Sequence, residues 1–144
     1  MMLSDRIIRE AAERYPTPLY IFNTDALLER FQYFRKHLGD EIGLTYCMKT
    51  NTFLTAASLP ETQRIEVCSD GEFRVCRSLE IPPEKLLISG VLKRVEDLEE
   101  ILDYCGDRAL YTAESPSQLE LLNRMGIEGN LVLRVLQRLT NGSQ

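Results

Sequence analysis

The feature of this sequence that most constrains its fold is a regular alternation of short apolar runs with amphipathic segments. Continuous apolar strands alternating with helices are typical of a buried parallel sheet with short right-handed connections. The pattern therefore predicts an α/β fold, either part of a (β/α)8 TIM-type barrel or a doubly wound sheet. The predicted strands are residues 42–49, 65–68, 86–88, 109–112 and 131–136.

The length of the chain and its glycine pattern bear on the choice between these two folds. No G-x-G-x-x-G follows a predicted strand, which weakens the dinucleotide-binding version of the doubly wound sheet. A complete barrel needs about 250 residues, whereas this chain has 144. We therefore expect a partial barrel with about five of the eight strands, in a sequence that looks like the front part of a larger protein.

Two elements precede this pattern. Ser4 can cap a helix that ends at Tyr15-Pro16-Thr17-Pro18, because proline removes a backbone donor. The run Leu19–Phe22 is short, apolar and rich in strand formers, which predicts a strand. The alternation itself begins with an amphipathic helix that ends near Gly39.

Charge and hydropathy narrow the possible partners and location. The formal net charge is −5, and no run of lysine and arginine supplies a basic patch, which argues against nucleic-acid binding. No stretch approaches the roughly 20 apolar residues that a membrane helix needs. The first residues lack the apolar segment of a signal peptide. We therefore expect a cytoplasmic protein without a membrane partner.

The cysteine pattern gives no sign of a metal centre. Cys47, Cys68, Cys76 and Cys105 form no C-x-x-C pair, and His37 is the only histidine, so we expect no zinc site. Each cysteine lies in an apolar segment, where cysteine usually acts as a small hydrophobic residue. The sequence favours reduced, structural thiols.

Lys49 is the residue most suggestive of chemistry. It lies where the predicted strand 42–49 ends and a polar loop begins. Ligands of parallel α/β proteins bind at the carboxyl ends of strands. A primary amine there could form a Schiff base with an aldehyde cofactor or a carbonyl substrate. The alternative is a solvated lysine at the end of a strand.

Arg134 is a charge inside an apolar strand. If it is buried it needs a carboxylate partner, for which Glu66 or Glu72 would serve. The alternative is an arginine that points outward. Glu72 also follows Ser69 at the spacing of a capping box, which would satisfy two backbone N–H groups of a helix start.

Several segments, in the right order, resemble the start of the fold-type III pyridoxal-phosphate decarboxylases. This family includes the diaminopimelate, ornithine and arginine decarboxylases and is related in fold to alanine racemase. The resemblance covers nearly the whole chain. The segments are Thr17-Pro18-Leu19-Tyr20 (family T-P-x-Y), Tyr46–Asn51 (Y-A-V-K-A/C-N), Ile65–Glu72 (F-D-x-x-S-x-x-E), Gly90-Val91-Leu92-Lys93 (G-x-x-K) and Leu133-Arg134 (a leucine-arginine strand).

The resemblance implies roles for four residues. Lys49 would be the catalytic residue that holds pyridoxal 5'-phosphate in a Schiff base, and the cofactor would act as an electron sink during decarboxylation. Glu72 matches a family glutamate near the cofactor pocket. Glu66 stands where the family usually has aspartate, and the alternative for its longer side chain is a solvated position at the strand edge. Together with Arg134, these residues form the expected cofactor site.

The resemblance also implies an architecture and an activity. Residues 1–23, with their helix and strand, would belong to a second, β-rich domain, and residues 24–144 would form the first part of the pyridoxal-binding barrel. The active site would lie between the subunits of a homodimer that acts on a small amino acid, with diaminopimelate as our first choice. One alternative is a non-catalytic fragment or relative that associates through unpaired sheet edges. Another is a racemase or a pyridoxal-phosphate-carrying protein on the same barrel.

Overall fold

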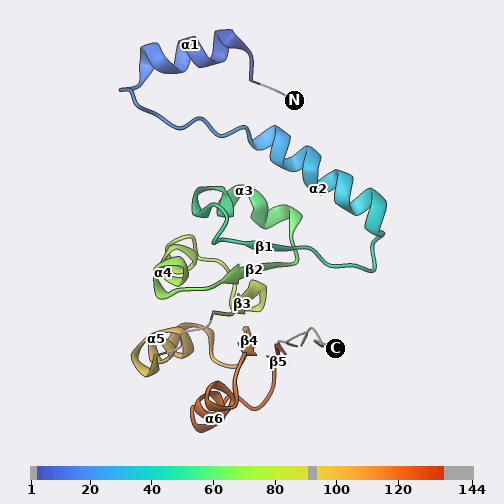
Figure 1. Ribbon diagram of the computed structural model, residues 1–144, viewed down its shortest axis with the longest axis vertical. Helices are drawn as coiled ribbons and strands as arrows, with labels where there is room; N and C mark the ends of the chain where they lie inside the picture. The colour runs from blue at the N-terminus through green and yellow to red at the C-terminus, as the bar shows by residue number, and fades with distance from the viewer. Residues whose placement is uncertain (1–2, 91–93, 135–144) are drawn as a thin grey trace, which may run out of the picture.

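The computed structural model describes residues 3–90 and 94–134. Its strands form one five-stranded sheet in the order β1-β2-β3-β4-β5, and every neighbouring pair is parallel (Figure 1). The strands are β1 (Thr45–Cys47), β2 (Arg64–Val67), β3 (Leu86–Ile88), β4 (Leu110–Ala113) and β5 (Leu131–Leu133).

Helices and short 3-10 turns connect the strands. The helices are α1 (Asp5–Arg14), α2 (Thr24–Leu38), α3 (Thr55–Ser58), α4 (Asp70–Ser78), α5 (Val95–Cys105) and α6 (Pro116–Arg124). The 3-10 turns are η1 (Thr52–Leu54), η2 (Leu59–Glu61) and η3 (Pro83–Lys85).

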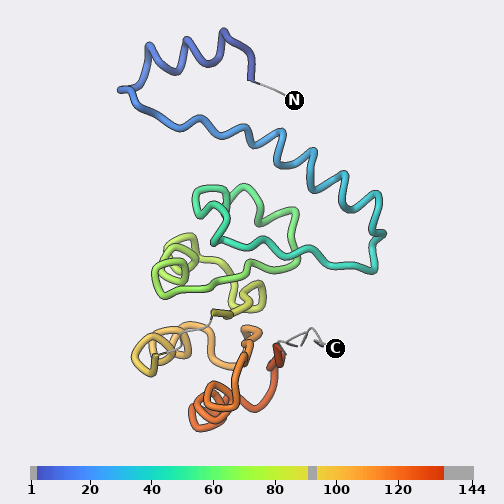
Figure 2. The backbone as a smooth tube through the Cα atoms, viewed as in Figure 1, coloured from blue at the N-terminus to red at the C-terminus, as the bar shows by residue number. Residues whose placement is uncertain are grey.

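The order of the strands distinguishes between the two predicted folds. A doubly wound sheet reverses its strand order at a switch point, whereas here each strand lies beside the next one in sequence. Figure 1 shows α4, α5 and α6 stacked along the same side of the sheet, and Figure 2 shows the strand–helix units following one another along the molecule. This is the winding of a barrel wall, so the prediction of a partial (β/α)8 barrel is confirmed.

The core lies between the sheet and these helices. Ile65 and Val67 of β2 alternate with Glu66, and the two apolar side chains are almost fully buried while Glu66 is only half-buried. Phe73 of α4 and Leu98 of α5 are also buried and belong to the same apolar cluster. Because successive side chains of a strand point to opposite faces, the other face of the sheet carries Glu66 beside its register partner Leu87, and its polar side chains lie toward the carboxyl ends of the strands.

The N-terminal segment follows the prediction only in part. The hydroxyl of Ser4 accepts a hydrogen bond from the backbone N–H of Ile7, so the predicted cap of α1 is confirmed. The strand predicted at Leu19–Phe22 is wrong, because no described segment runs beside it to share hydrogen bonds. Tyr20 is 88% exposed there. No helix among residues 3–90 and 94–134 is long and apolar enough to cross a membrane.

The predicted barrel strands are all present; β3 has the predicted bounds, and the other strands have shifted ends. β1 covers three residues of the predicted range 42–49, because its hydrogen-bonded partner is the short strand β2. β5 begins at Leu131 as predicted and ends at Leu133, and the rest of the predicted strand 131–136 lies partly outside the described residues.

Candidate functional site

Lys49 lies in an ordered turn directly after β1. The Met48 N–H donates to the Glu66 carbonyl oxygen at 3.1 Å, so Met48 is still held against β2. The Thr50 N–H donates to the Cys47 carbonyl oxygen at 3.1 Å and closes the turn around Lys49. Met48 is fully buried, whereas Lys49 is exposed. The sheet thus anchors the backbone on one side of the amine and leaves the amine accessible.

Tyr46 fixes the far end of the same turn. Its hydroxyl donates to the carbonyl oxygen of Asn51 at 2.6 Å. Burial raises the pKa of this phenol above its usual range, with a smaller contribution from Cys47, so the hydroxyl stays protonated and able to donate. The Asn51 side chain in turn accepts from the Phe53 N–H at 3.1 Å and starts η1. The segment Tyr46–Asn51 is therefore closed by a side-chain hydrogen bond across it.

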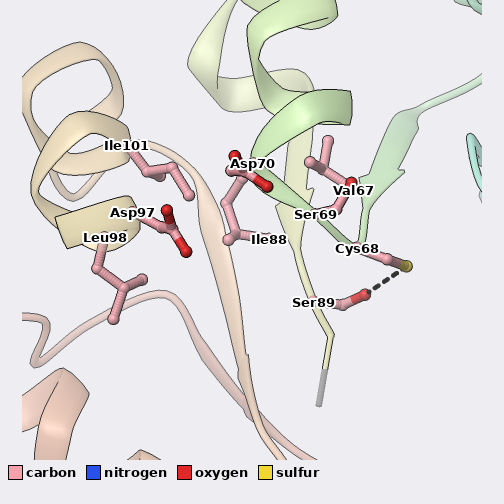
Figure 3. A pocket seen from close by; sticks show the side chains of 9 residues that line it. All are labelled: Val67, Cys68, Ser69, Asp70, Ile88, Ser89, Asp97, Leu98 and Ile101. Carbon is pink, nitrogen blue, oxygen red and sulfur yellow. Dashed lines mark hydrogen bonds between the residues drawn. The ribbon is translucent and has the colours of Figure 1, made fainter. Parts of the chain in front are cut away.

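Glu66 is half-buried in the middle of the polar face. The Ser89 hydroxyl donates to its Oε1 at 2.8 Å, and the same hydroxyl lies 3.3 Å from Cys68 Sγ (Figure 3). Burial, and then a hydrogen bond to Glu66, raise the pKa of the Cys47 thiol to about 11. The strand-edge alternative for Glu66 is therefore wrong, because the carboxylate is held within a cluster of three strand ends.

Glu72 closes the junction between β2 and α4. The Ser69 hydroxyl accepts from the Glu72 N–H at 3.3 Å, and Glu72 Oε2 accepts from the Cys68 N–H at 2.7 Å. The second bond goes to the residue before the cap and not to the cap itself, so only the Ser69 half of a capping box is present. The capping role predicted for Ser69 is confirmed, whereas the bond predicted for the Glu72 side chain is shifted by one residue. Its predicted contact with a cofactor stays a prediction.

Arg134 pairs with neither carboxylate suggested by the sequence. Its Nη1 lies 3.4 Å from Glu114 Oε1, and its backbone N–H donates to the Ala113 carbonyl oxygen at 2.9 Å. The reason is topological: Glu114 follows the adjacent strand β4, whereas Glu66 and Glu72 belong to β2 and α4, two strands farther along the sheet. The arginine side chain is 57% exposed, while that of Glu114 is 8% exposed.

Polar side chains thus line one face of the sheet toward the carboxyl ends of its strands. Thr112 of β4 is on this face by alternation, and its Oγ1 is buried without a hydrogen-bond partner among the described residues. In barrels this end is where ligand-binding residues gather. An accessible amine, a half-buried carboxylate and an unsatisfied buried hydroxyl suit a polar ligand with a reactive carbonyl group, and these residues therefore fit pyridoxal phosphate.

Gly90 allows β3 to end against β2. Its φ is +106°, and a Cβ at this position would lie 2.6 Å from the Cys68 carbonyl oxygen. Only glycine meets both conditions without strain. The lysine of the same predicted motif, Lys93, lies outside the described residues.

Sequence reasoning missed one grouping of side chains. The ligand-capable atoms of Cys47, Glu66 and Cys68 all lie within 4.8 Å of one another. The only signal was strand parity: β1 pairs Cys47 with Glu66, and Cys68 is two residues farther on the same face. Local spacing rules for cysteine do not detect a grouping that the sheet assembles.

Comparisons with known proteins agree with this geometry. Residues 24–144 match the family described as "Pyridoxal-dependent decarboxylase, pyridoxal binding domain". A diaminopimelate decarboxylase of Aquifex aeolicus is 27% identical over 134 residues, which are 89% of this chain and 31% of that protein. A lysine/ornithine decarboxylase of Selenomonas ruminantium is 25% identical over 138 residues, 94% of this chain and 34% of that protein.

The similarity extends to a solved structure. The crystal structure of the lysine decarboxylase from Selenomonas ruminantium superposes with a TM-score of 0.81 at 24% identity, covering 100% of this chain and 39% of that one. At this identity the likeness establishes the fold. The chain spans about a third of the length of the curated relatives it matches.

Proposed function

Because the chain belongs to the pyridoxal-dependent decarboxylases through their pyridoxal-binding domain, we propose that it is part of a pyridoxal-phosphate-dependent amino-acid carboxy-lyase. In this proposal Lys49 is the residue whose amine would hold the cofactor. The observation that carries it is the position of Lys49, which is exposed after β1 in a turn held at both ends.

Each residue of the site has a distinct part in this function. Bound pyridoxal phosphate supplies an electron sink when a carboxylate leaves as carbon dioxide. Lys49 holds the cofactor, and Glu66, fixed by the Ser89 hydroxyl, places a negative charge among the strand ends. Glu72 belongs to the proposed cofactor site through the backbone that it holds after β2, and Arg134 through its ion pair with Glu114 after β4.

The proposed substrate is an amino acid with a second amino group, and diaminopimelate is the first choice. Its support is the set of relatives, which are diaminopimelate and lysine/ornithine decarboxylases. We further propose that the whole protein is a cytoplasmic homodimer with a role in lysine biosynthesis. Residues 1–23 would pack in its second, β-rich domain, which fits the finding that α1 buries none of its residues.

Borohydride trapping tests the role of Lys49. The purified chain is incubated with pyridoxal phosphate and reduced, and the modified peptide is identified by mass spectrometry. We expect modification at Lys49, loss of this modification in Lys49→Ala, and no loss in Lys36→Ala, which removes another exposed lysine. Specific trapping that persists in Lys49→Ala would contradict the assignment.

A second assay tests the reaction itself. Because the chain covers only part of its relatives, the protein tested is the longest one that contains this chain. Release of carbon dioxide from a panel of diamino acids, measured beside racemisation of the same compounds, separates a decarboxylase from a racemase. Racemisation without release of carbon dioxide would contradict the proposed activity.

A further inference from the structure

We propose that Cys47, Glu66 and Cys68 form a binding site for Zn²⁺, a divalent cation with high affinity for thiolates. This site shares Glu66 with the proposed cofactor site, but it does not depend on the proposed attachment of pyridoxal phosphate to Lys49. It also revises the expectation, drawn from local cysteine spacing, that the chain has no zinc site.

The geometry of the sheet brings the three donors together. Cys47 and Glu66 are register partners on β1 and β2, and Cys68 follows β2 on the same face. Their donor atoms all lie within 4.8 Å of one another. Zinc binds cysteine sulfur at about 2.3 Å and carboxylate oxygen at about 2.0–2.2 Å. Small side-chain rotations are therefore enough to bring all three donors onto a single ion.

Ser89 supplies the outer support that metal ligands usually have. Its hydroxyl donates to Glu66 Oε1 at 2.8 Å, which leaves the second carboxylate oxygen for the ion. The same hydroxyl lies 3.3 Å from Cys68 Sγ, as Figure 3 shows at the edge of a small pocket between β2, β3 and α5. Ser89 therefore touches two of the three ligands in the metal-free protein, and once Cys68 is a thiolate its single hydroxyl proton orients Glu66, as outer-shell partners do in zinc sites.

The chemistry of the donor set favours zinc over magnesium or calcium. Two thiols and one carboxylate suit a borderline-soft ion, whereas the hard cations prefer oxygen ligands. On binding, each thiol transfers its proton to solvent, so one Zn²⁺ replaces two protons and nothing is oxidised or reduced. Three protein ligands leave a fourth position for water, as in open zinc sites.

Two of the three ligands are positions where this chain departs from the motif of the family it resembles. Cys47 replaces the alanine of Y-A-V-K, and Glu66 replaces the aspartate of F-D-x-x-S. All three residues are half-buried. A partly buried site restricts competing water while leaving the ion a path of entry.

Metal titration tests the site on the full 144-residue chain, reduced, freed of metal with a chelator and kept without pyridoxal. Co²⁺ serves as a spectroscopic probe, because thiolate ligands give it a charge-transfer band, and Zn²⁺ affinity is measured by competition. We expect one ion per chain. Cys47→Ser and Cys68→Ser should each weaken binding by about 100-fold or more. Ser89→Ala should weaken it by about 10- to 100-fold, the usual effect of losing an outer-shell partner.

Cys105→Ala is the matched control, since it removes a thiol that is buried in the core away from the three ligands. It should bind Zn²⁺ like the unaltered chain. A thiolate band of equal strength in Cys47→Ser and Cys68→Ser would overturn the proposal, as would the absence of any such band in the unaltered chain.

Alkylation of the unaltered chain gives a readout that requires no variant to fold. Zn²⁺ should slow the reaction of iodoacetamide with Cys47 and Cys68 by about tenfold or more, because a thiolate bound to the metal is a poorer nucleophile. The modified cysteines are identified by mass spectrometry. Equal rates with and without Zn²⁺ would overturn the site. Either result leaves the trapping experiment on Lys49 unaffected, because no pyridoxal is present.

Discussion

Glu72 shows how one side chain can organise the junction from which a site is built. Its carboxylate accepts from the Cys68 N–H while its own N–H donates to Ser69. Gln118 repeats this arrangement at the start of α6, where its side chain accepts from the Glu114 N–H at 2.9 Å and its N–H donates to Ser115. The loops after β2 and β4 are therefore fixed by the same local device.

We expect Glu72→Ala to lower the free energy of unfolding by about 0.5–1.5 kcal/mol, the usual net contribution of one hydrogen bond. Glu72→Gln keeps an acceptor at the same position, so its loss of free energy of unfolding, measured by urea denaturation, should be clearly smaller. Gln118→Ala is the matched variant at α6 and should cost a similar amount. Equal losses in Glu72→Ala and Glu72→Gln would contradict a role based on this hydrogen bond.

Residues that act through near neighbours in the chain could be predicted, and those that act across the sheet could not. The Ser69-x-x-Glu72 spacing predicts a cap, which the structure contains with one bond shifted by a residue. The prediction of the carboxylate partner of Arg134 was wrong, because that partner depends on strand order, which a single sequence does not specify. The cluster around Ser89 was missed for the same reason.

At the scale of elements, the turn after β1 is the one that matters most for the proposed chemistry. Thr52 Oγ1 lies 3.4 Å from the Met48 carbonyl oxygen, and the Tyr46 hydroxyl reaches Asn51 across the same turn. Strand β1 itself is short, so these side-chain hydrogen bonds stabilise the turn that connects it to η1. The sequence predicted where this strand would end to within two residues, since the apolar run stops there.

Tyr46→Phe removes the hydroxyl that spans this turn. Losing a hydrogen bond of this kind should lower the free energy of unfolding by about 0.5–1.5 kcal/mol. The looser turn should also slow the attachment of pyridoxal phosphate to Lys49, measured as the fraction trapped by borohydride over time. Tyr20→Phe is the control, because Tyr20 is 88% exposed and its ring contact with Phe22 does not need the hydroxyl. Unchanged stability and trapping in Tyr46→Phe would contradict this role.

At the scale of the whole molecule, the sheet has two unlike faces. One is covered by α4, α5 and α6 (Figure 1), and the other presents polar side chains such as Glu66 and Thr112 toward the strand ends. The alternation of apolar runs predicted the parallel sheet, because buried parallel strands are apolar along most of their length. Among the described residues Leu19–Phe22 has no pairing partner, because strand pairing depends on segments distant in sequence.

Thiols buried on the covered face make the free energy of unfolding fall at alkaline pH. Burial raises the pKa of the Cys76 thiol from 9.0 to about 12 and that of Cys105 from 9.0 to about 11. Burial also raises the pKa of Tyr111. In the unfolded chain the thiols lose their protons near pH 9, so the unfolded state binds fewer protons than the folded state above that pH. The stability associated with the neutral thiols is therefore complete below pH 9 and declines as the pH rises toward 11–12.

We expect the free energy of unfolding, measured by urea denaturation under reducing conditions, to fall between pH 9 and pH 11. Each thiol can contribute a slope of at most about 1.4 kcal/mol per pH unit. Cys76→Ala should be less stable at pH 7 but should show a shallower decline, because one of the titrating groups is gone. Ile101→Val removes a buried methyl group from the same core, at a cost of about 0.5–1.5 kcal/mol, and should leave the slope unchanged. A slope that Cys76→Ala does not reduce would show that this buried thiol is not linked to folding.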